Sequence, residues 1–271
     1  AVEVVNEHGL TRQLEIPAER PLTVYVDKRE LVTLMTLGAH PEWLVLGYLL
    51  NQRLILAATE VESITVDWEV GAAAVKTHHG IADLSEKTAK RVVTTGCGQG
   101  SVFGDLMTDV DSIALPEATL TQSALYGIVN TIRLHDSVYK AAGSVHGCAL
   151  FQGDQMLMFV EDVGRHNAVD TIAGWMWMHG IHPALAPADE PWAFYTTGRL
   201  TSEMVLKAAQ MQVPVVVSRS GITQMGFEMA QRLGLCTVGR ATHKRFLCYT
   251  APQVLLWQPE LAQTTVKRAP T

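Results

Sequence analysis

The second half of the chain alternates between two periods of hydrophobic residues. Apolar residues recur at helical spacing between positions 125 and 132, which predicts an amphipathic helix over about 119–138. Two apolar runs, 148–151 and 156–160, flank Gly153-Asp154 and predict a β-hairpin. Further elements then follow in the order helix 166–179, strand 192–196, helix 201–211, strand 213–217, helix 223–233, strand 236–239 and strand 246–250. This alternation is typical of a layered α/β domain with a largely parallel sheet.

The first hundred residues have a different pattern. Strands are predicted at 22–26 and 31–35 around a hairpin tip, and again at 64–70 and 73–77. A helix should begin at Pro41, because proline is favoured at the first helical position. The sequence therefore predicts a smaller β-rich domain over residues 1–115 and an α/β domain over residues 116–271.

Composition and charge narrow the class of protein. The chain has 271 residues, of which 48% are hydrophobic and 18% are charged, so it is long enough and apolar enough for one large or two modest cores. The net charge of −6 argues against a protein that binds nucleic acid over its whole surface. A local basic patch remains compatible with this balance.

The spacing of the cysteines and the length of the apolar runs indicate the cellular compartment of the protein. The four cysteines, Cys97, Cys148, Cys236 and Cys248, are widely spaced and form no CxxC pair, which favours a reducing compartment over a disulfide framework. No apolar run is long enough to span a bilayer, and the first residues lack the basic start and apolar core of a signal peptide. We therefore expect a cytoplasmic protein without a membrane partner.

One cysteine stands apart from the others. Cys97 lies in the run TTGCGQGS, among three glycines and three small hydroxyl residues, which predicts an exposed, mobile loop. An exposed cysteine is usually retained for its reactivity. Cys148, Cys236 and Cys248 lie in apolar strand contexts and are predicted to be core residues.

Three polar segments in the second half follow predicted strands, and each contains an arginine. They are 161–167 with Arg165 and His166, 196–199 with Thr197 and Arg199, and 218–221 with Ser218 and Arg219. Ligands of open α/β sheets bind beyond the carboxyl ends of strands, and the guanidinium fork suits phosphate. Any one arginine alone could pair with a surface carboxylate, and Asp162 could cap a helix. Three arginines at equivalent turns favour a phosphorylated or nucleotide-like ligand.

A zinc site is the rival reading of the segment 143–148, which contains His146 and Cys148. Zinc deaminases need an H-x-E motif followed by P-C-x-x-C, and this chain has neither the glutamate at position 148 nor a later CxxC. We therefore rank a zinc hydrolase of nucleobases last and expect no metal ligand set.

Together these runs carry a family pattern. EDVGRHNAVD at 161–170, TGRLTSEM at 197–204 and PVVVSRS at 214–220 resemble the formate dehydrogenase accessory sulfurtransferase family, called FdhD. ERPL at 19–22 and LGYL at 46–49 also fit, so the similarity covers nearly the whole chain.

The resemblance implies a fold and a function. It implies a cytidine-deaminase-like layered α/β domain without zinc. It also implies a sulfurtransferase that takes sulfur from a cysteine desulfurase as a persulfide on Cys97. The sulfur would pass to the molybdenum or tungsten bis(molybdopterin guanine dinucleotide) cofactor of formate dehydrogenase, which GDP would mimic, and the protein would be a homodimer. The cofactor-contacting stretch of the family matches Arg240, Ala241, Thr242, His243, Lys244 and Arg245.

Two departures from the family pattern bear on mechanism. Many members have a second cysteine where this chain has Gly100, so Cys97 would act alone. The family often has an aromatic residue at the position of Arg240 and Pro-Gly at His243-Lys244. The missing cysteine favours the alternative function, a module that binds the cofactor or a guanine nucleotide without sulfur chemistry.

Overall fold

The computed structural model describes residues 1–81 and 110–262 of the chain. Its strands are β1 (Val2–Val5), β2 (Thr11–Leu14), β3 (Arg20–Val26), β4 (Arg29–Thr36), β5 (Val61–Asp67), β6 (Ala72–Thr77), β7 (Leu120–Thr121), β8 (His146–Gln152), β9 (Gln155–Asp162), β10 (Trp192–Thr196), β11 (Val215–Ser218), β12 (Cys236–Thr242), β13 (Arg245–Thr250) and β14 (Leu255–Leu256). Its α-helices are α1 (Pro41–Asn51), α4 (Gln122–Leu134), α5 (Val138–Ala142), α6 (Arg165–Met178), α7 (Ser202–Gln210) and α8 (Gln224–Leu233). Short 3₁₀ turns lie at Ala58–Glu60, Val110–Ser112, Pro183–Leu185, Pro252–Val254 and Pro259–Ala262.

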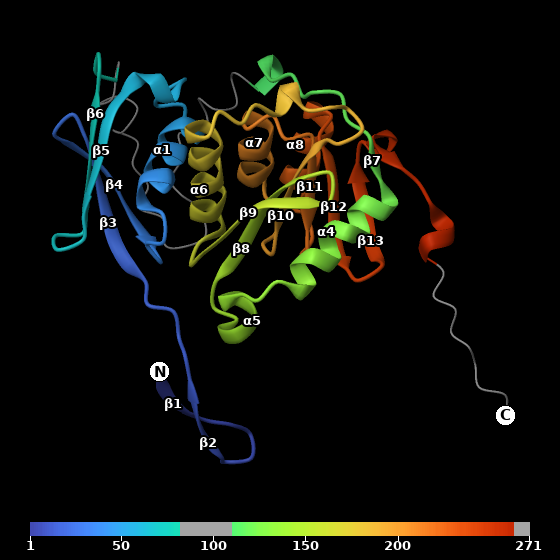
Figure 1. The fold of residues 1–271 in the computed structure, drawn as a ribbon, viewed down its shortest axis with the longest axis horizontal. Helices are drawn as coiled ribbons and strands as arrows, with labels where there is room; N and C mark the ends of the chain where they lie inside the picture. Colours follow the sequence, from blue (N-terminus) through green and yellow to red (C-terminus); the bar gives the residue numbers. More distant parts are fainter. Residues whose placement is uncertain (82–109, 263–271) are drawn as a thin grey trace.

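The larger sheet has six strands in the order β13-β12-β11-β10-β8-β9. Strands β10, β11 and β12 are parallel, whereas β8, β9 and β13 join them through antiparallel pairings. The expectation of a largely parallel sheet was therefore wrong, because the hairpins β8–β9 and β12–β13 give the sheet antiparallel flanks. Helix α4 covers one face, and α6, α7 and α8 cover the other (Figure 1).

Strand alternation explains the two cores of this sheet. Cys148 and Leu150 of β8 are fully buried with the residues of α6 and α7, whereas Ala149 and Phe151 of the same strand are buried with those of α4. Successive side chains of a strand point to opposite faces, so the apolar run of β8 supplies both layers. Hydroxyl side chains cap three of the described helices, α4, α5 and α8: Thr121, for example, caps α4 by accepting from the N–H of Ala124 at 3.1 Å.

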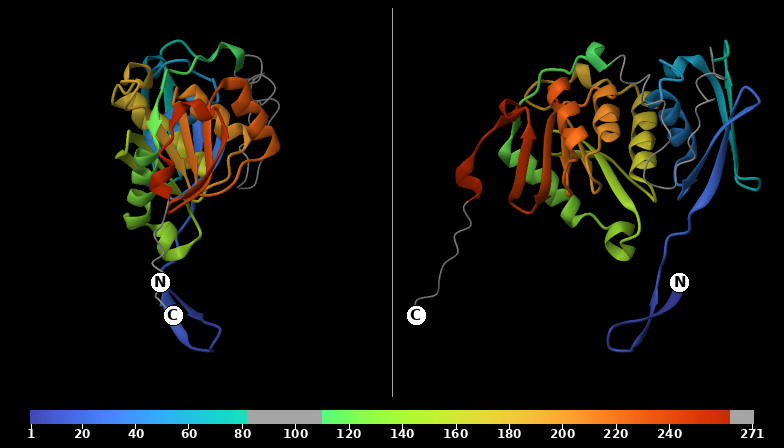
Figure 2. Two further views of the ribbon diagram at one scale, coloured as in Figure 1. Left: turned by 90° about the vertical axis from the view of Figure 1, so that its right-hand side faces the viewer. Right: turned by 180° about the vertical axis from the view of Figure 1, so that it is seen from behind.

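The smaller sheet has the order β4-β3-β6-β5 and packs on α1. Its β3–β4 turn consists of Asp27 and Lys28, which have φ values of +46° and +70°. Positive φ at both central residues is the geometry of a type I′ hairpin turn. Figures 1 and 2 show this sheet, α1 and α6 side by side, with α1 between the sheet and α6.

Helices α1 and α6 cross at two glycines. A Cβ atom on Gly47 would lie 1.7 Å from the carbonyl oxygen of Asp170, and one on Gly174 would lie 1.9 Å from that of Trp43. The backbones can therefore approach this closely only because both residues lack side chains. The crossing joins the residues of the smaller sheet to the α/β layers.

Polar groups hold the same junction. The buried carboxylate of Asp162 accepts from the hydroxyl of Thr36 and from the N–H of Leu37, and Asn167 donates to the carbonyl of Met35 at 2.7 Å. Asp162 is thus not the cap of α6, whose N-cap residue is Gly164. The boundary that the sequence suggested near Pro116 stays a prediction.

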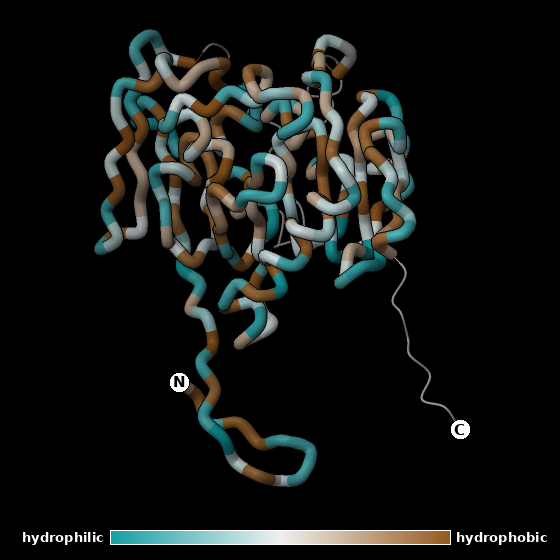
Figure 3. The backbone as a smooth tube through the Cα atoms, turned by 45° about the vertical axis from the view of Figure 1, so that its right-hand side comes forward, coloured by the Kyte–Doolittle hydropathy of each residue, from teal (hydrophilic) through white to brown (hydrophobic). Residues whose placement is uncertain are grey.

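Strands β1 and β2 form a hairpin that projects away from the rest of the molecule (Figures 1 and 2). In Figure 3 this hairpin carries hydrophobic residues next to hydrophilic ones. Val5 and Leu10 are 66% and 63% exposed. The hydrophobic pattern did not predict this hairpin. Within the described residues, no helix combines the length and apolarity needed to cross a bilayer.

Candidate functional site

The three arginine-bearing loops lie at one edge of the larger sheet. Strands β9, β10 and β11 all end there, because β9 and β10 each run antiparallel to β8, and β11 runs parallel to β10. Hydrogen bonds connect the loops: the N–H of Arg219 donates to the carbonyl of Thr196 at 3.0 Å, and the hydroxyl of Ser220 donates to the carbonyl of Thr197 at 2.9 Å. The convergence that the strand pattern predicted is therefore present.

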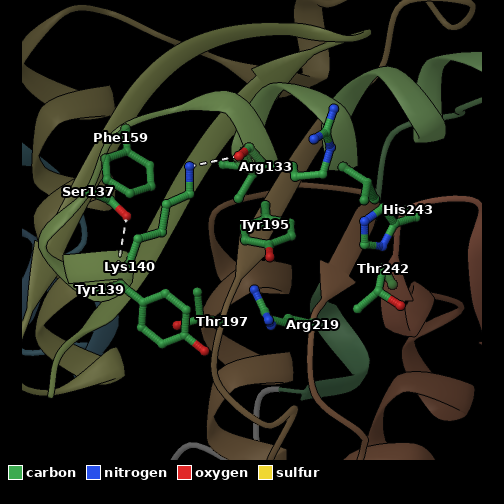
Figure 4. A pocket seen from close by; sticks show the side chains of 13 residues that line it. Arg133, Ser137, Tyr139, Lys140, Phe159, Tyr195, Thr197, Arg219, Thr242 and His243 are labelled. Carbon is green, nitrogen blue, oxygen red and sulfur yellow. Dashed lines mark hydrogen bonds between the residues drawn. The ribbon is translucent and has the colours of Figure 1, made fainter. Parts of the chain in front are cut away.

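A pocket opens at this edge on the α4 side of the sheet (Figure 4). It is a small cavity of about 110 Å³ that is open to solvent at its mouth. We call it the edge pocket; its lining residues are Val129, Ile132, Arg133, Ser137, Tyr139, Lys140, Phe159, Tyr195, Thr197, Arg219, Ala241, Thr242 and His243.

The lining of the edge pocket is aromatic and cationic. Tyr139, Phe159 and Tyr195 supply rings, and Arg133, Lys140 and Arg219 supply positive charge. None of the thirteen described lining residues is Asp or Glu. Such a lining suits a ligand that has a planar ring and an anionic group, since aromatic faces pack on bases and guanidinium groups bind phosphate.

Local contacts fix several of these side chains. Lys140 donates to the carbonyl groups of Arg133, at 2.7 Å, and His135, so its ammonium group caps the end of α4. The guanidinium of Arg219 lies 5.7 Å from the ring centre of Tyr139, a cation–π distance. Burial raises the pKa of Tyr195 to about 12, so its hydroxyl stays protonated and can donate a hydrogen bond.

Five of the residues predicted to bind a cofactor line the edge pocket. They are Thr197, Arg219, Ala241, Thr242 and His243. Ala241 and Thr242 end β12, and His243 lies in the turn that follows, where it has a φ of +52°. A non-glycine residue in the left-handed region is uncommon and is often found at functional sites. The remaining predicted residues lie elsewhere.

Arg240, Lys244 and Arg245 are exposed on the same hairpin without lining the edge pocket. Lys244 donates to the carbonyl of Leu261 at 3.1 Å. Ser218 is fully buried; its hydroxyl donates to the carbonyl of Gly198 at 2.7 Å and accepts from the N–H of Ser220 at 2.9 Å. Ser218 therefore shapes the turn that presents Arg219.

Arg165 and His166 begin α6, on the opposite side of the sheet from the edge pocket, and both are buried. Nδ1 of His166 lies 3.5 Å from Oε1 of Glu203, a residue whose pKa is raised by burial. The cluster continues to Lys207 and Asp170. These two predicted residues thus belong to a buried charge cluster behind the sheet.

Sequence reasoning missed several lining residues. Tyr139 lies in the first turn of the short helix α5, and Phe159 lies in β9, which was predicted as the second strand of a hairpin but not as part of a site. Arg133 lies within the predicted helix 119–138, in its last turn, where a cation also favours the helix dipole. Helical periodicity located Arg133 on a helix but gave no sign of the pocket beside it.

Cys97 lies outside the described residues, so its surroundings stay a prediction. Burial raises the pKa of the Cys148 thiol to about 12, which makes this cysteine a poor nucleophile. Cys236 is buried, as predicted for a core residue. Cys248 is half-buried, and a hydrogen bond with Cys236 lowers its pKa. The described residues contain no group of three or more His, Cys, Asp or Glu side chains that could bind a metal ion.

Comparisons with known proteins give a consistent result. The model of the FdhD/NarQ family matches residues 17–256. The chain is 31% identical over 241 residues to "Sulfur carrier protein FdhD" of Bacillus pumilus (strain SAFR-032), covering 88% of this chain and 89% of that protein. It is 30% identical to the protein of the same name from Bacillus subtilis (strain 168), covering 87% and 88%.

A crystal structure from Desulfotalea psychrophila, described as that of a formate dehydrogenase accessory protein, has the same fold. The TM-score is 0.74 at 24% sequence identity, and the alignment covers 94% of this chain and 97% of that one.

Proposed function

We propose that this chain, which belongs to the FdhD/NarQ family, is a sulfur carrier that serves formate dehydrogenase as an accessory protein. The names of its relatives in two Bacillus species support the sulfur-carrying role. The fold shared with the Desulfotalea psychrophila protein agrees with it. The layered sheet, with helices on both faces, supports the proposed cytidine-deaminase-like architecture.

The sulfur step is assigned to Cys97. Its thiolate attacks the outer sulfur of a persulfide on a cysteine desulfurase, and the thiolate of the desulfurase leaves. The outer sulfur of the persulfide on Cys97 would then pass to the metal of a molybdenum or tungsten bis(molybdopterin guanine dinucleotide) substrate in its reduced, tetravalent state. The S–S bond breaks, Cys97 leaves as a thiolate, and the substrate metal supplies the two electrons that convert the sulfur to a bound sulfide, which makes the protein a sulfurtransferase. One thiol suffices to carry the sulfur. Because position 100 is glycine, no second cysteine of the loop can release that sulfur as sulfide.

The edge pocket is assigned to a guanine nucleotide arm of this substrate. The lining of the pocket supports this assignment, because three aromatic rings and three cations surround the cavity without a carboxylate among the described lining residues. Arg240, Lys244 and Arg245 lie on the hairpin that supplies Thr242 and His243, so we assign them to ligand groups outside the pocket. A homodimer would provide two such pockets for a substrate with two nucleotide arms.

A thermal shift experiment tests whether the edge pocket binds a guanine nucleotide. A ligand that binds only the folded state raises its apparent stability, so GDP should raise the Tm more than ADP does at the same concentration. Arg219→Gln should lose most of this shift, whereas Arg12→Gln on the projecting hairpin should keep it. If GDP and ADP shift the Tm equally, or if neither shifts it, the edge pocket does not bind a guanine nucleotide.

A cofactor-binding module without sulfur chemistry is the second candidate. Gly100, at the position of the second loop cysteine, is the observation that favours it. A Cys97→Ala variant separates the two functions, because a sulfur carrier loses its ability to activate formate dehydrogenase in cells and a binding module retains it. The amount of soluble variant protein serves as the control for folding.

A further inference from the structure

The projecting hairpin of β1 and β2 has an apolar face that its own chain leaves uncovered. We call residues 2–16, which contain this hairpin, the arm. Val2 pairs with Leu14 and Val4 pairs with Arg12, so these side chains share one face of the hairpin. The three apolar residues of this face belong to none of the hydrophobic cores of the described residues.

A hairpin of only two strands needs a surface on which to pack. Such a hairpin is marginally stable in water unless a third strand joins it or its apolar face is covered. The turn of the arm is built locally, because the side chain of Asn6 accepts from the N–H groups of His8 and Leu10, both at 3.0 Å. In the described sheets, β1 and β2 pair only with each other. The surface that covers the arm therefore lies outside the part of the chain that the structure describes.

The junction of α4 and α5 offers an apolar surface at the same end of the molecule. Leu134 ends α4 and Val138 begins α5, and the two side chains are 62% and 40% exposed beside the arm of their own chain. We call residues 134–138 the α4–α5 corner. Figures 1 and 2 show the arm and α5 at the same end of the molecule in each view. One chain thus carries two exposed apolar surfaces that do not cover each other.

Charge also matches the arm to the region of the corner. The arm carries one arginine, Arg12, and three glutamates, Glu3, Glu7 and Glu15. The corner lies at the sheet edge of the arginine-bearing loops, since the N–H of Val138 donates to the carboxylate of Glu161 in β9 at 2.7 Å. Asp136 and Glu161 are the acids of the corner, whereas the exposed cations around this edge are Arg133, Lys140, Arg199, Arg219, Arg240, Lys244 and Arg245. A mainly negative arm and a mainly positive edge favour association.

The position of both surfaces at one end of the chain favours a second copy as the partner. In a two-fold dimer the same patch of both copies meets, so the patch has to complement itself. An arm and a corner at one end meet this condition, because each arm can lie on the corner of the other copy. A second copy therefore supplies both halves of the contact at once.

We propose that the arm packs its apolar face on the α4–α5 corner of a second copy of this chain, and that the reciprocal contact closes a two-fold dimer. This inference rests on the homodimer of the proposed function and identifies the surfaces that form it. The arm precedes residues 17–256, which the family model matches, so membership of the family does not imply this contact. Because Ser137 of the corner lines the edge pocket, the arm of one copy borders the pocket of the other.

Sedimentation velocity over a range of protein concentrations tests the contact. Wild type should dimerise. Leu14→Lys on the arm and Leu134→Glu on the corner should each raise the Kd of the dimer at least about 100-fold, because a tenfold loss at each of two equal contacts multiplies. Val5→Lys is the matched control on the arm, since Val5 lies on the opposite face, and Leu185→Glu is the control at an 81% exposed leucine outside the corner. Both controls should dimerise as wild type does, and melting curves check that all four variants are folded.

A mixture of Leu14→Lys and Leu134→Glu shows which surfaces meet. In a mixed dimer one arm and the corner beneath it are unchanged, and in the other contact the introduced lysine faces the introduced glutamate. The mixture should therefore form a dimer that neither variant forms alone. A contact of arm with arm, or of corner with corner, pairs neither set of charges and gives no recovery, which would overturn the inference.

The outcomes separate this inference from the function on which it rests. If wild type is monomeric at every concentration, the homodimer and the arm contact both fail. If wild type dimerises and either Leu14→Lys or Leu134→Glu dimerises equally well, the arm contact is wrong while the homodimer stands. Neither result bears on the sulfur step at Cys97, which has its own test.

Discussion

Nζ of Lys207 lies 2.8 Å from Oδ2 of Asp170, and the two side chains are only 3% and 0% exposed. Asp170 also accepts from Asn51 of α1 at 2.7 Å, so the pair ties α7, α6 and α1 together. A buried charge that loses its partner is costly because water cannot replace that partner.

Asp170→Asn is therefore expected to lower the free energy of unfolding by about 3–5 kcal/mol. The exposed pair of Lys76 and Glu62, at 2.6 Å, gives a matched control, since Lys76→Met should cost less than about 1 kcal/mol. Urea unfolding of both variants makes the comparison. A cost for Asp170→Asn as small as that of the surface variant would show that Lys207 does not depend on this carboxylate.

The crossing of α1 and α6 predicts a strict requirement for glycine. Alanine at position 47 would place its Cβ 1.7 Å from the carbonyl oxygen of Asp170, and only a shift of the helix backbones could relieve that clash. Although alanine favours helices, Gly47→Ala should lower the free energy of unfolding by at least about 2 kcal/mol. At Gly221, where an added Cβ would meet its nearest atom at 3.9 Å, alanine should be well tolerated. Similar stabilities of the two variants would contradict the described crossing.

Titration of His146 should make the free energy of unfolding depend on pH. Its pKa is lowered in the folded state, so the unfolded chain binds more protons there and the stability falls as pH drops through about 6.5. His146→Gln removes this contribution, and its free energy of unfolding should fall less steeply than that of wild type between pH 7.5 and 5.5. The buried carboxyls, whose pKa values are raised, contribute equally in both proteins. Parallel curves for the two proteins would show that His146 titrates normally.

The absence of a side chain at Gly147 leaves room for the ring of Phe159, which lines the edge pocket. A Cβ at this position would lie 3.0 Å from the ring tip of Phe159 and 3.7 Å from Thr197. Gly147→Ala therefore requires the Phe159 ring to move, which should weaken GDP binding about tenfold with only a small change in Tm. Calorimetry and a melting curve check both parts. Unchanged GDP affinity would mean that Phe159 is not part of the ligand site.

Hydrophobic periodicity predicted most elements of the α/β layers. The strand expected at 192–196 is β10 itself, and the helix expected over 119–138 is α4, which is shorter at both ends. Periodicity does not encode strand direction, which is why the mixed sheet was read as largely parallel. The hairpin of β1 and β2 was missed because its exposed residues show no buried face.

The candidate site was predicted only in part, for a geometric reason. Residues that directly follow β10 and β11, such as Thr197 and Arg219, line the edge pocket because strand ends fix their position at the sheet edge. Arg165 follows a strand in the same way, but the first turn of α6 directs it to the opposite face of the sheet. Tyr139 and Phe159 carry no motif, so only the packing of α5 and β9 around the pocket identifies them.

Mass spectrometry can show whether Cys97 carries sulfur. The protein would be incubated with a cysteine desulfurase and cysteine, digested without reductant, and searched for peptides that carry an added sulfur atom. We expect a persulfide on Cys97, its absence in Cys97→Ala, and its retention in Cys248→Ala, which removes the half-buried thiol of β13. An unmodified Cys97 under conditions in which the desulfurase is loaded with sulfur would rule out this cysteine as the sulfur carrier.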